Sequence, residues 1–76
     1  MEYTFFMKES NSPCLVIADT VNGRYAIRLA DTSGQVFTAA NELIEWITAN
    51  WSEDMFEDHN DYTNILNSIH KELISF

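Results

Sequence analysis

The side chains that could do chemistry are concentrated between residues 52 and 62, which read SEDMFEDHNDY. This stretch holds five carboxylates and no Lys or Arg; the five are Glu53, Asp54, Glu57, Asp58 and Asp61. Carboxylates so close together can bind Ca²⁺, transfer protons, or present a negative surface to a cationic partner. Each of these three chemistries requires a different supporting pattern in the rest of the chain.

The pattern for calcium is incomplete. An EF-hand loop beginning at Asp58 would have Thr63 at its sixth position, where Gly is needed, and Ile69 at its twelfth, where Glu is needed. Loops that begin at the neighbouring aspartates fail as well. A looser site formed by Glu57, Asp58 and Asp61 would make the protein a calcium-responsive module, and this is the weakest of the alternatives.

The sequence also lacks the residue patterns that transition-metal sites and catalytic sites require. His59 and His70 are eleven residues apart, which on one helix separates them by roughly 16 Å, too far to share an ion. Catalysis requires a positioned group with a supporting partner in a pocket, and the carboxylates and hydroxyls lie on predicted surfaces. Both glycines, Gly23 and Gly34, are accounted for by turns, so there is no phosphate-binding loop. We predict a protein that is not an enzyme and uses no metal or cofactor.

The overall charge restricts the class of partner. The net charge is −8, from twelve acidic and four basic residues, so phosphate backbones and anionic membranes repel the protein and basic protein surfaces attract it. The longest apolar run, at residues 14–18, is much shorter than the roughly 20 residues that span a bilayer. The N-terminus does not resemble a secretory signal, and the single cysteine, Cys14, can form no internal disulfide. We therefore expect a cytoplasmic protein, with Cys14 buried and inert.

The first half of the chain has the pattern of strands. Residues 2–8 alternate in part, and residues 13–21 and 24–31 flank Asn22-Gly23, which predicts a hairpin with a two-residue turn. A type I turn over DTSG at residues 31–34 would lead into a short further strand. We predict a three- or four-stranded antiparallel meander.

The Asn22-Gly23 turn also predicts which residues face each other in the hairpin. Ala18 would lie opposite Ile27 and Val16 opposite Leu29, on the face that forms the core. The reverse face would then present a mixed surface of aliphatic and basic side chains, which is our alternative partner face: Leu15, Ile17, Arg24 and Arg28.

The second half has the spacing of helices. Apolar residues from Ala39 to Trp51 follow one helical face, with Thr38 as N-cap and Glu42 and Glu45 on the opposite side. A second stripe, within a helix from about residue 60 to residue 75, consists of Tyr62, Ile65, Leu66, Ile69, Leu73 and Phe76. Between the helices, Ser52 would cap a short acidic turn or helix. The predicted fold is α+β: a single domain over residues 1–76, in which the two C-terminal helices pack on one face of the meander.

The charge distribution is the strongest functional signal. The forty-two residues from Leu29 to His70 contain eight carboxylates and no Lys or Arg. If residues 53–61 were helical, their four-residue spacing would place like charges side by side, at a cost of a few tenths of a kcal/mol per pair. A merely solvated acidic surface is the simpler explanation.

Our functional hypothesis is that the five carboxylates, with Glu42 and Glu45, occupy a basic surface of a nucleic-acid-handling protein, as a nucleic-acid mimic would. Small phage-encoded inhibitors of host defence systems share this size and charge, although no motif connects them to this chain. Met55 and Phe56 would either belong to the core or supply apolar anchors for the partner. The alternative hypothesis is a regulatory or assembly module that binds a partner protein, or itself as a homodimer, through the alternative partner face or an edge strand.

Overall fold

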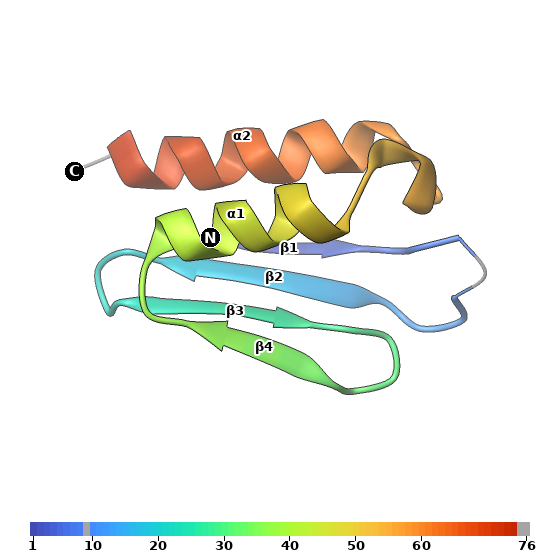
Figure 1. Cartoon of the computed structure of the whole chain (residues 1–76), viewed down its shortest axis with the longest axis horizontal. Coiled ribbons are helices and arrows are strands. Elements are labelled where there is room, and N and C mark those ends of the chain that lie inside the picture. Colours follow the sequence, from blue (N-terminus) through green and yellow to red (C-terminus); the bar gives the residue numbers. More distant parts are fainter. Residues whose placement is uncertain (9, 75–76) are drawn as a thin grey trace.

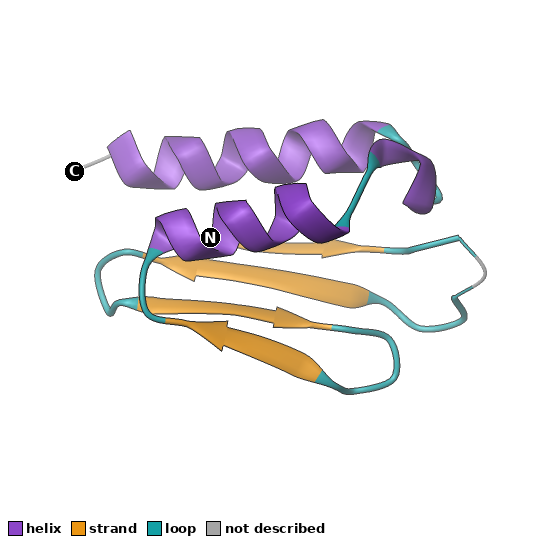
Figure 2. Ribbon diagram, in the orientation of Figure 1, coloured by secondary structure: helices purple, strands orange, loops and turns teal. Residues whose placement is uncertain are grey.

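The protein folds as a four-stranded sheet followed by two helices. The computed structural model describes residues 1–8 and 10–74. Its elements are β1 (Glu2–Phe5), β2 (Cys14–Asp19), β3 (Arg24–Arg28), β4 (Gly34–Phe37), α1 (Ala40–Asn50), the short 3₁₀ helix η1 (Glu53–Met55) and α2 (Asn60–Ile74). The strands form one antiparallel meander in the order β1-β2-β3-β4, and both helices cover the same face of it (Figures 1 and 2). The predicted α+β fold is confirmed, with four strands.

The pairing of β2 with β3 is shifted by two residues from the prediction. Val16, and not Ala18, lies opposite Ile27, while Ala18 lies opposite Tyr25. A shift of two residues is one full repeat of a strand, so every side chain keeps its face of the sheet. All four side chains are buried, and the predicted core face is correct even though the predicted pairs are not.

The shift originates in the turn. A four-residue loop, residues 20–23, replaces the two-residue turn that we predicted at Asn22-Gly23. Gly23 has a positive φ of 66°, whereas Asn22 does not, and a type I′ turn requires a positive φ at both central residues. The Asp19 carboxylate accepts hydrogen bonds from the side-chain amide of Asn22 (2.7 Å) and from its backbone N–H (3.2 Å). These bonds close the longer loop and lower the pKa of Asp19.

The turn between β3 and β4 also begins earlier than predicted. The N–H of Thr32 donates to the carbonyl of Leu29 (3.0 Å), and Thr32 has a left-handed φ of 70°. Gly34 does not end a type I turn but begins β4. A Cβ at Gly34 would lie 2.5 Å from the carbonyl oxygen of Ile27, so this position needs glycine for the close approach of the two strands.

The core lies between the sheet and the helices. α1 packs on β3 and β4, and α2 packs on β2. The fully buried side chains of the two helices are Leu43, Ile47, Ile65 and Ile69, at the spacing that the sequence predicted. Cys14 is buried beneath the helices as expected, and burial raises the pKa of its thiol. Phe76 lies outside the described residues. None of the helices that the structure describes has the length and apolar character needed to cross a membrane.

Candidate functional site

The acidic segment is anchored by one aromatic side chain. Phe56 is fully buried, and its ring centroid lies 5.2 Å from that of Phe5, 5.6 Å from that of Trp51 and 5.9 Å from that of Tyr62. The neighbouring Met55 is 42% exposed. The structure therefore divides the pair that the sequence left undecided: Phe56 is core, and Met55 lies on the surface.

Backbone hydrogen bonds attach the same segment to the edge of the sheet. The N–H of Lys8 donates to the carbonyl of Met55 (3.0 Å), and the N–H of Glu57 donates to the carbonyl of Phe6 (3.0 Å). Met7 lies opposite Phe56 in an antiparallel bridge. Residues 55–57 thus pair with residues 6–8, just beyond the end of β1, and fix the segment at this corner of the sheet.

The carboxylates of the segment are not arranged on one helix. η1 ends at Met55, and Phe56 is extended, with φ −92° and ψ 144°. The extended residue is what allows the ring of Phe56 to enter the core before α2 begins at Asn60. The helical stacking of like charges that we inferred from the spacing of Glu53, Glu57 and Asp61 is therefore wrong.

Two of the five carboxylates have roles within the fold. Asp58 accepts a hydrogen bond from the N–H of Asn60 (3.0 Å) at the start of α2. Asp61 accepts one from the hydroxyl of Tyr3 (2.8 Å) and so links α2 to β1. Burial raises the pKa of Tyr3, and the hydrogen bond to Asp61 raises it further.

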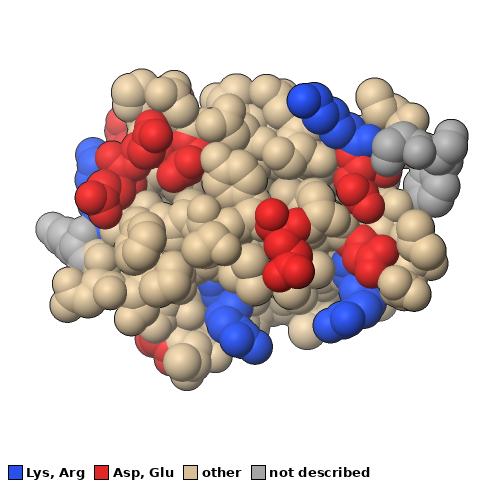
Figure 3. Space-filling view, turned by 180° about the vertical axis from the view of Figure 1, so that it is seen from behind, with Lys and Arg blue, Asp and Glu red and all other residues tan. Residues whose placement is uncertain are grey.

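The other three carboxylates point to solvent. Glu53, Asp54 and Glu57 are exposed, and their side chains make no hydrogen bond or ion pair within the described part of the chain. With Lys8 and His59 they line a shallow hollow of about 270 Å³. Figure 3 shows acidic side chains gathered at this end of the molecule, with a basic side chain at the margin. The hollow is acidic but partly balanced by Lys8.

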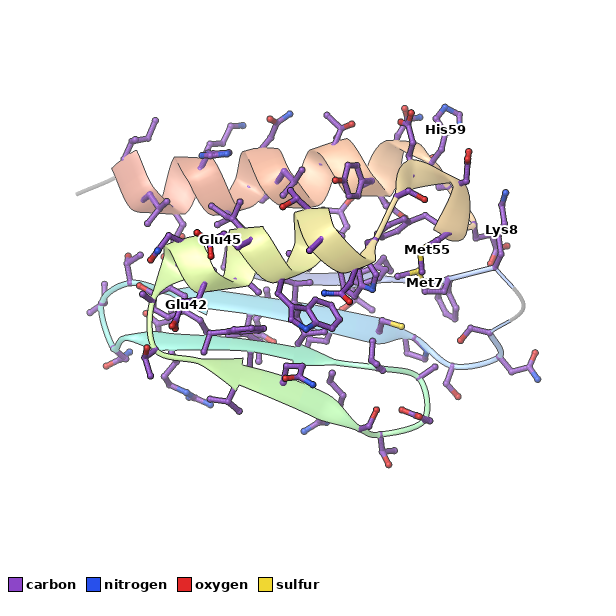
Figure 4. The ribbon with its side chains drawn as sticks, in the orientation of Figure 1. Met7, Lys8, Glu42, Glu45, Met55 and His59 are labelled. Atoms are coloured by element: carbon purple, nitrogen blue, oxygen red, sulfur yellow. The ribbon has the colours of Figure 1, made fainter. Side chains whose placement is uncertain are left out.

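The two acidic residues of α1 lie elsewhere. Figure 4 shows Glu42 in the first turn of α1 and Glu45 midway along it, both far along the molecule from Lys8 and His59. Glu42 accepts hydrogen bonds from the hydroxyl (2.7 Å) and the N–H (2.9 Å) of Thr38, which lower the pKa of its carboxyl. The N-cap of α1 is Ala39 rather than the predicted Thr38; Thr38 lies one residue earlier, and its hydroxyl donates to the Glu42 carboxylate instead of capping the helix. The structure does not bring Glu42 and Glu45 together with the acidic segment.

The residues of the alternative partner face do lie together. Leu15, Ile17, Arg24 and Arg28 line one hollow of about 370 Å³ on the face of the sheet away from the helices. Val36, on the neighbouring strand, lines it too and is 84% exposed. The sequence reasoning missed Val36, although its alternation with Gln35 and Phe37 in the fourth strand could have placed it on this face.

A third hollow, of about 590 Å³, lies between β4 and α1. Phe37 and Trp46 are half-buried in its wall, with ring centroids 6.3 Å apart, and Glu42 and Glu45 also line it. The sequence reasoning missed this groove. The groove exists because β4 is the last strand of the sheet and α1 crosses beside it. The periodicity of the two segments predicts neither the strand order nor the position of the helix.

Metal binding receives no support from this arrangement. In residues 1–8 and 10–74, no three His, Cys, Asp or Glu side chains converge in the way that a metal site requires. Comparison with protein-family models, with curated proteins and with solved structures finds no match to this chain. Its function is therefore inferred from the chemistry of the three surfaces.

Proposed function

We propose that this chain is a non-enzymatic acidic protein that occupies a basic, nucleic-acid-binding surface of another protein. The observation that supports this function is the projection of Glu53, Asp54 and Glu57 from a segment fixed by the buried ring of Phe56 and by backbone pairing to residues 6–8. Carboxylates held on a rigid support lose little conformational entropy on binding. A negative surface also speeds encounter with a positive one and selects the docking face.

Met55 supplies an apolar contact next to these charges. Its side chain is 42% exposed, and Figure 4 shows it beside Met7 at the same end of the molecule. Methionine adapts to irregular apolar surfaces, and interfaces depend on a few apolar or aromatic anchors surrounded by polar groups. The partner that fits is a basic groove with an apolar patch.

The setting we propose is the cytoplasm, where the single buried thiol of Cys14 needs no oxidising environment. Competition with nucleic acid for a basic groove would make the protein an inhibitor. Small phage-encoded inhibitors of host defence systems have the same size and charge, and this analogy supports an anti-defence role.

A comparison of two variants with equal net charge tests this function. Protein immobilised on a resin is exposed to lysate in low and in high salt, with and without competing double-stranded DNA. We expect a nucleic-acid-binding protein to be retained in low salt and displaced by DNA. Retention should fall at least tenfold in Glu53→Gln/Glu57→Gln, because each close charge pair across an interface contributes about 1.5 kcal/mol or more. It should persist in Glu2→Gln/Asp31→Asn, which makes the same change in net charge outside the acidic segment and outside the hollow between β4 and α1. If retention changed neither with salt nor in Glu53→Gln/Glu57→Gln, the proposed function would be refuted.

The second candidate is a module that binds a partner protein or a second copy through the alternative partner face. It is favoured by the hollow in which Leu15 and Ile17 lie beside Arg24 and Arg28. Such an interface would weaken in Ile17→Ser and would be insensitive to Glu53→Gln/Glu57→Gln. Gel filtration of the protein with and without Ile17→Ser separates a homodimer from a monomer.

A further inference from the structure

We propose that the groove between β4 and α1 binds an extended, cationic segment of a partner protein, which pairs with the outer edge of β4 as a fifth strand. This surface is separate from the acidic segment, and the inference does not depend on the function proposed above. It follows from the state of the sheet edge, the wall of the groove and the charge around it.

The edge of β4 is available for pairing. β4 is the last strand of the sheet, and no strand pairs with its outer side within residues 1–8 and 10–74. Sheet edges are usually blocked by Lys, Pro, a bulge or a covering segment. The sequence of β4 is GQVF, which has no charge and no proline, and Val36 is 84% exposed. An added strand would therefore meet an unobstructed backbone.

The groove provides a wall for one face of such a strand. It has a volume of about 590 Å³ and runs between β4 and α1. Phe37 and Trp46 present half-buried rings there, and Trp46 is in turn supported by Trp51, with ring centroids 5.3 Å apart. Because alternate side chains of a strand point to opposite faces, one set would enter the groove and the other would lie beside Val36.

The charge of the groove selects the occupant. The described residues that line it include Glu42 and Glu45 and no Lys or Arg. A Lys or Arg side chain can lay its aliphatic stem and its charge on the Trp46 ring while its head reaches Glu45. A second copy of this chain fits poorly, because pairing β4 with β4 would place two such acidic rims together on molecules of net charge −8. The occupant is a segment in which cationic and apolar residues alternate.

A capped seven-residue peptide of alternating Lys and Val is the probe. Titrated into the ¹⁵N-labelled full chain, it should shift the amide resonances of β4 and of residues 42–50 in a saturable way, with Kd below about 1 mM. An otherwise identical peptide of Glu and Val should not bind. A fully N-methylated Lys-Val peptide keeps its side chains but has no N–H to donate to β4, so its affinity should fall at least tenfold.

Two variants of equal charge test the location. Ala49 lines the groove from an exposed helical position, so Ala49→Arg would fill the groove and repel the peptide without disturbing the core. Asn67→Arg, on the exposed side of α2, makes the same change in net charge away from the groove. We expect loss of binding in Ala49→Arg alone. Three results would overturn the proposal: no saturable shift at millimolar peptide, equal binding by the N-methylated peptide, or shifts confined to residues 53–61.

Discussion

The chain is arranged differently beside the two outer strands of the sheet. Just beyond β1 the chain returns after α1, residues 55–57 pair with residues 6–8, and the ring of Phe56 is buried in the core. At β4 the edge carries no covering segment in the described chain, and a groove lined by aromatic rings runs along it. The region beyond β1 presents exposed carboxylates, whereas β4 presents an unpaired backbone edge (Figures 1 and 4).

The two regions differ in how rigidly the backbone is held in a domain of this size. Beyond β1, the buried ring of Phe56 holds the backbone that carries Glu53, Asp54 and Glu57. β4 is held by its pairing to β3 and by packing against α1. A charged surface gains from a fixed frame, whereas an edge that accepts a strand must remain unpaired until the strand arrives.

The largest effect is expected from removing Phe56, the aromatic anchor of the segment that pairs beyond β1. Phe56→Ala should lower the free energy of unfolding by about 3–5 kcal/mol, because it removes a fully buried ring and leaves a cavity. This is most of the stability of a small domain, so much of the variant should be unfolded at 25 °C. Urea denaturation followed by Trp fluorescence measures the change. Met55→Ala, one residue earlier and half exposed, should cost about 1 kcal/mol or less; equal losses in the two variants would contradict the anchoring role.

An intermediate effect is expected from the bond that ties α2 to the β1 edge. Tyr3→Phe removes the hydroxyl that donates to Asp61 and should cost about 1 kcal/mol at pH 7. Tyr62→Phe is the matched control, because the Tyr62 hydroxyl makes no hydrogen bond within the described residues.

The pH dependence of the same bond has a definite sign. Burial and the hydrogen bond to Asp61 raise the pKa of Tyr3 above its ordinary value of about 10, so the folded state favours the protonated hydroxyl. Its contribution is complete below pH 10 and is lost as the pH rises through the higher folded pKa. Urea unfolding between pH 7 and pH 11 should show the difference between the protein and Tyr3→Phe shrinking above pH 10. A difference that grows there would show that the sign is wrong.

The sequence was sufficient for the elements and for the faces of the strands. Ile65 and Ile69 on α2, or Tyr25 and Ile27 on β3, are identified by periodicity alone, because burial on one side forces an apolar residue at each repeat. The residue pairs between β2 and β3 could not be predicted from the sequence. The side chain of Asp19 decides between a two-residue and a four-residue loop, and this competition between local hydrogen bonds is invisible to the alternation of apolar residues.

The candidate site was predictable in composition and not in arrangement. The charge run identified the acidic segment, yet Asp58 and Asp61 turn out to hold α2 in place, and only tertiary structure brings Tyr3 to Asp61. The groove lined by Trp46 was also missed, because it forms only when β4 and α1 pack side by side. The strand and the helix follow each other in the sequence, but their different periodicities give no sign of that packing.

The smallest effect is expected from the outward carboxylates themselves. If Glu53 and Glu57 serve a partner and not the fold, Glu53→Gln/Glu57→Gln should leave the protein at least as stable. Tm should rise by about 1–2 °C in low salt, because the repulsion among the carboxylates that line the same hollow is relieved. The gain should vanish near 0.5 M NaCl, where exposed charges are screened within a few Å. Calorimetry beside Glu2→Gln/Glu45→Gln, which has the same net charge, isolates the local part of the effect. A lower Tm for the first variant alone would mean that these side chains stabilise the segment beyond β1, and the surface would then be structural instead of reserved for binding.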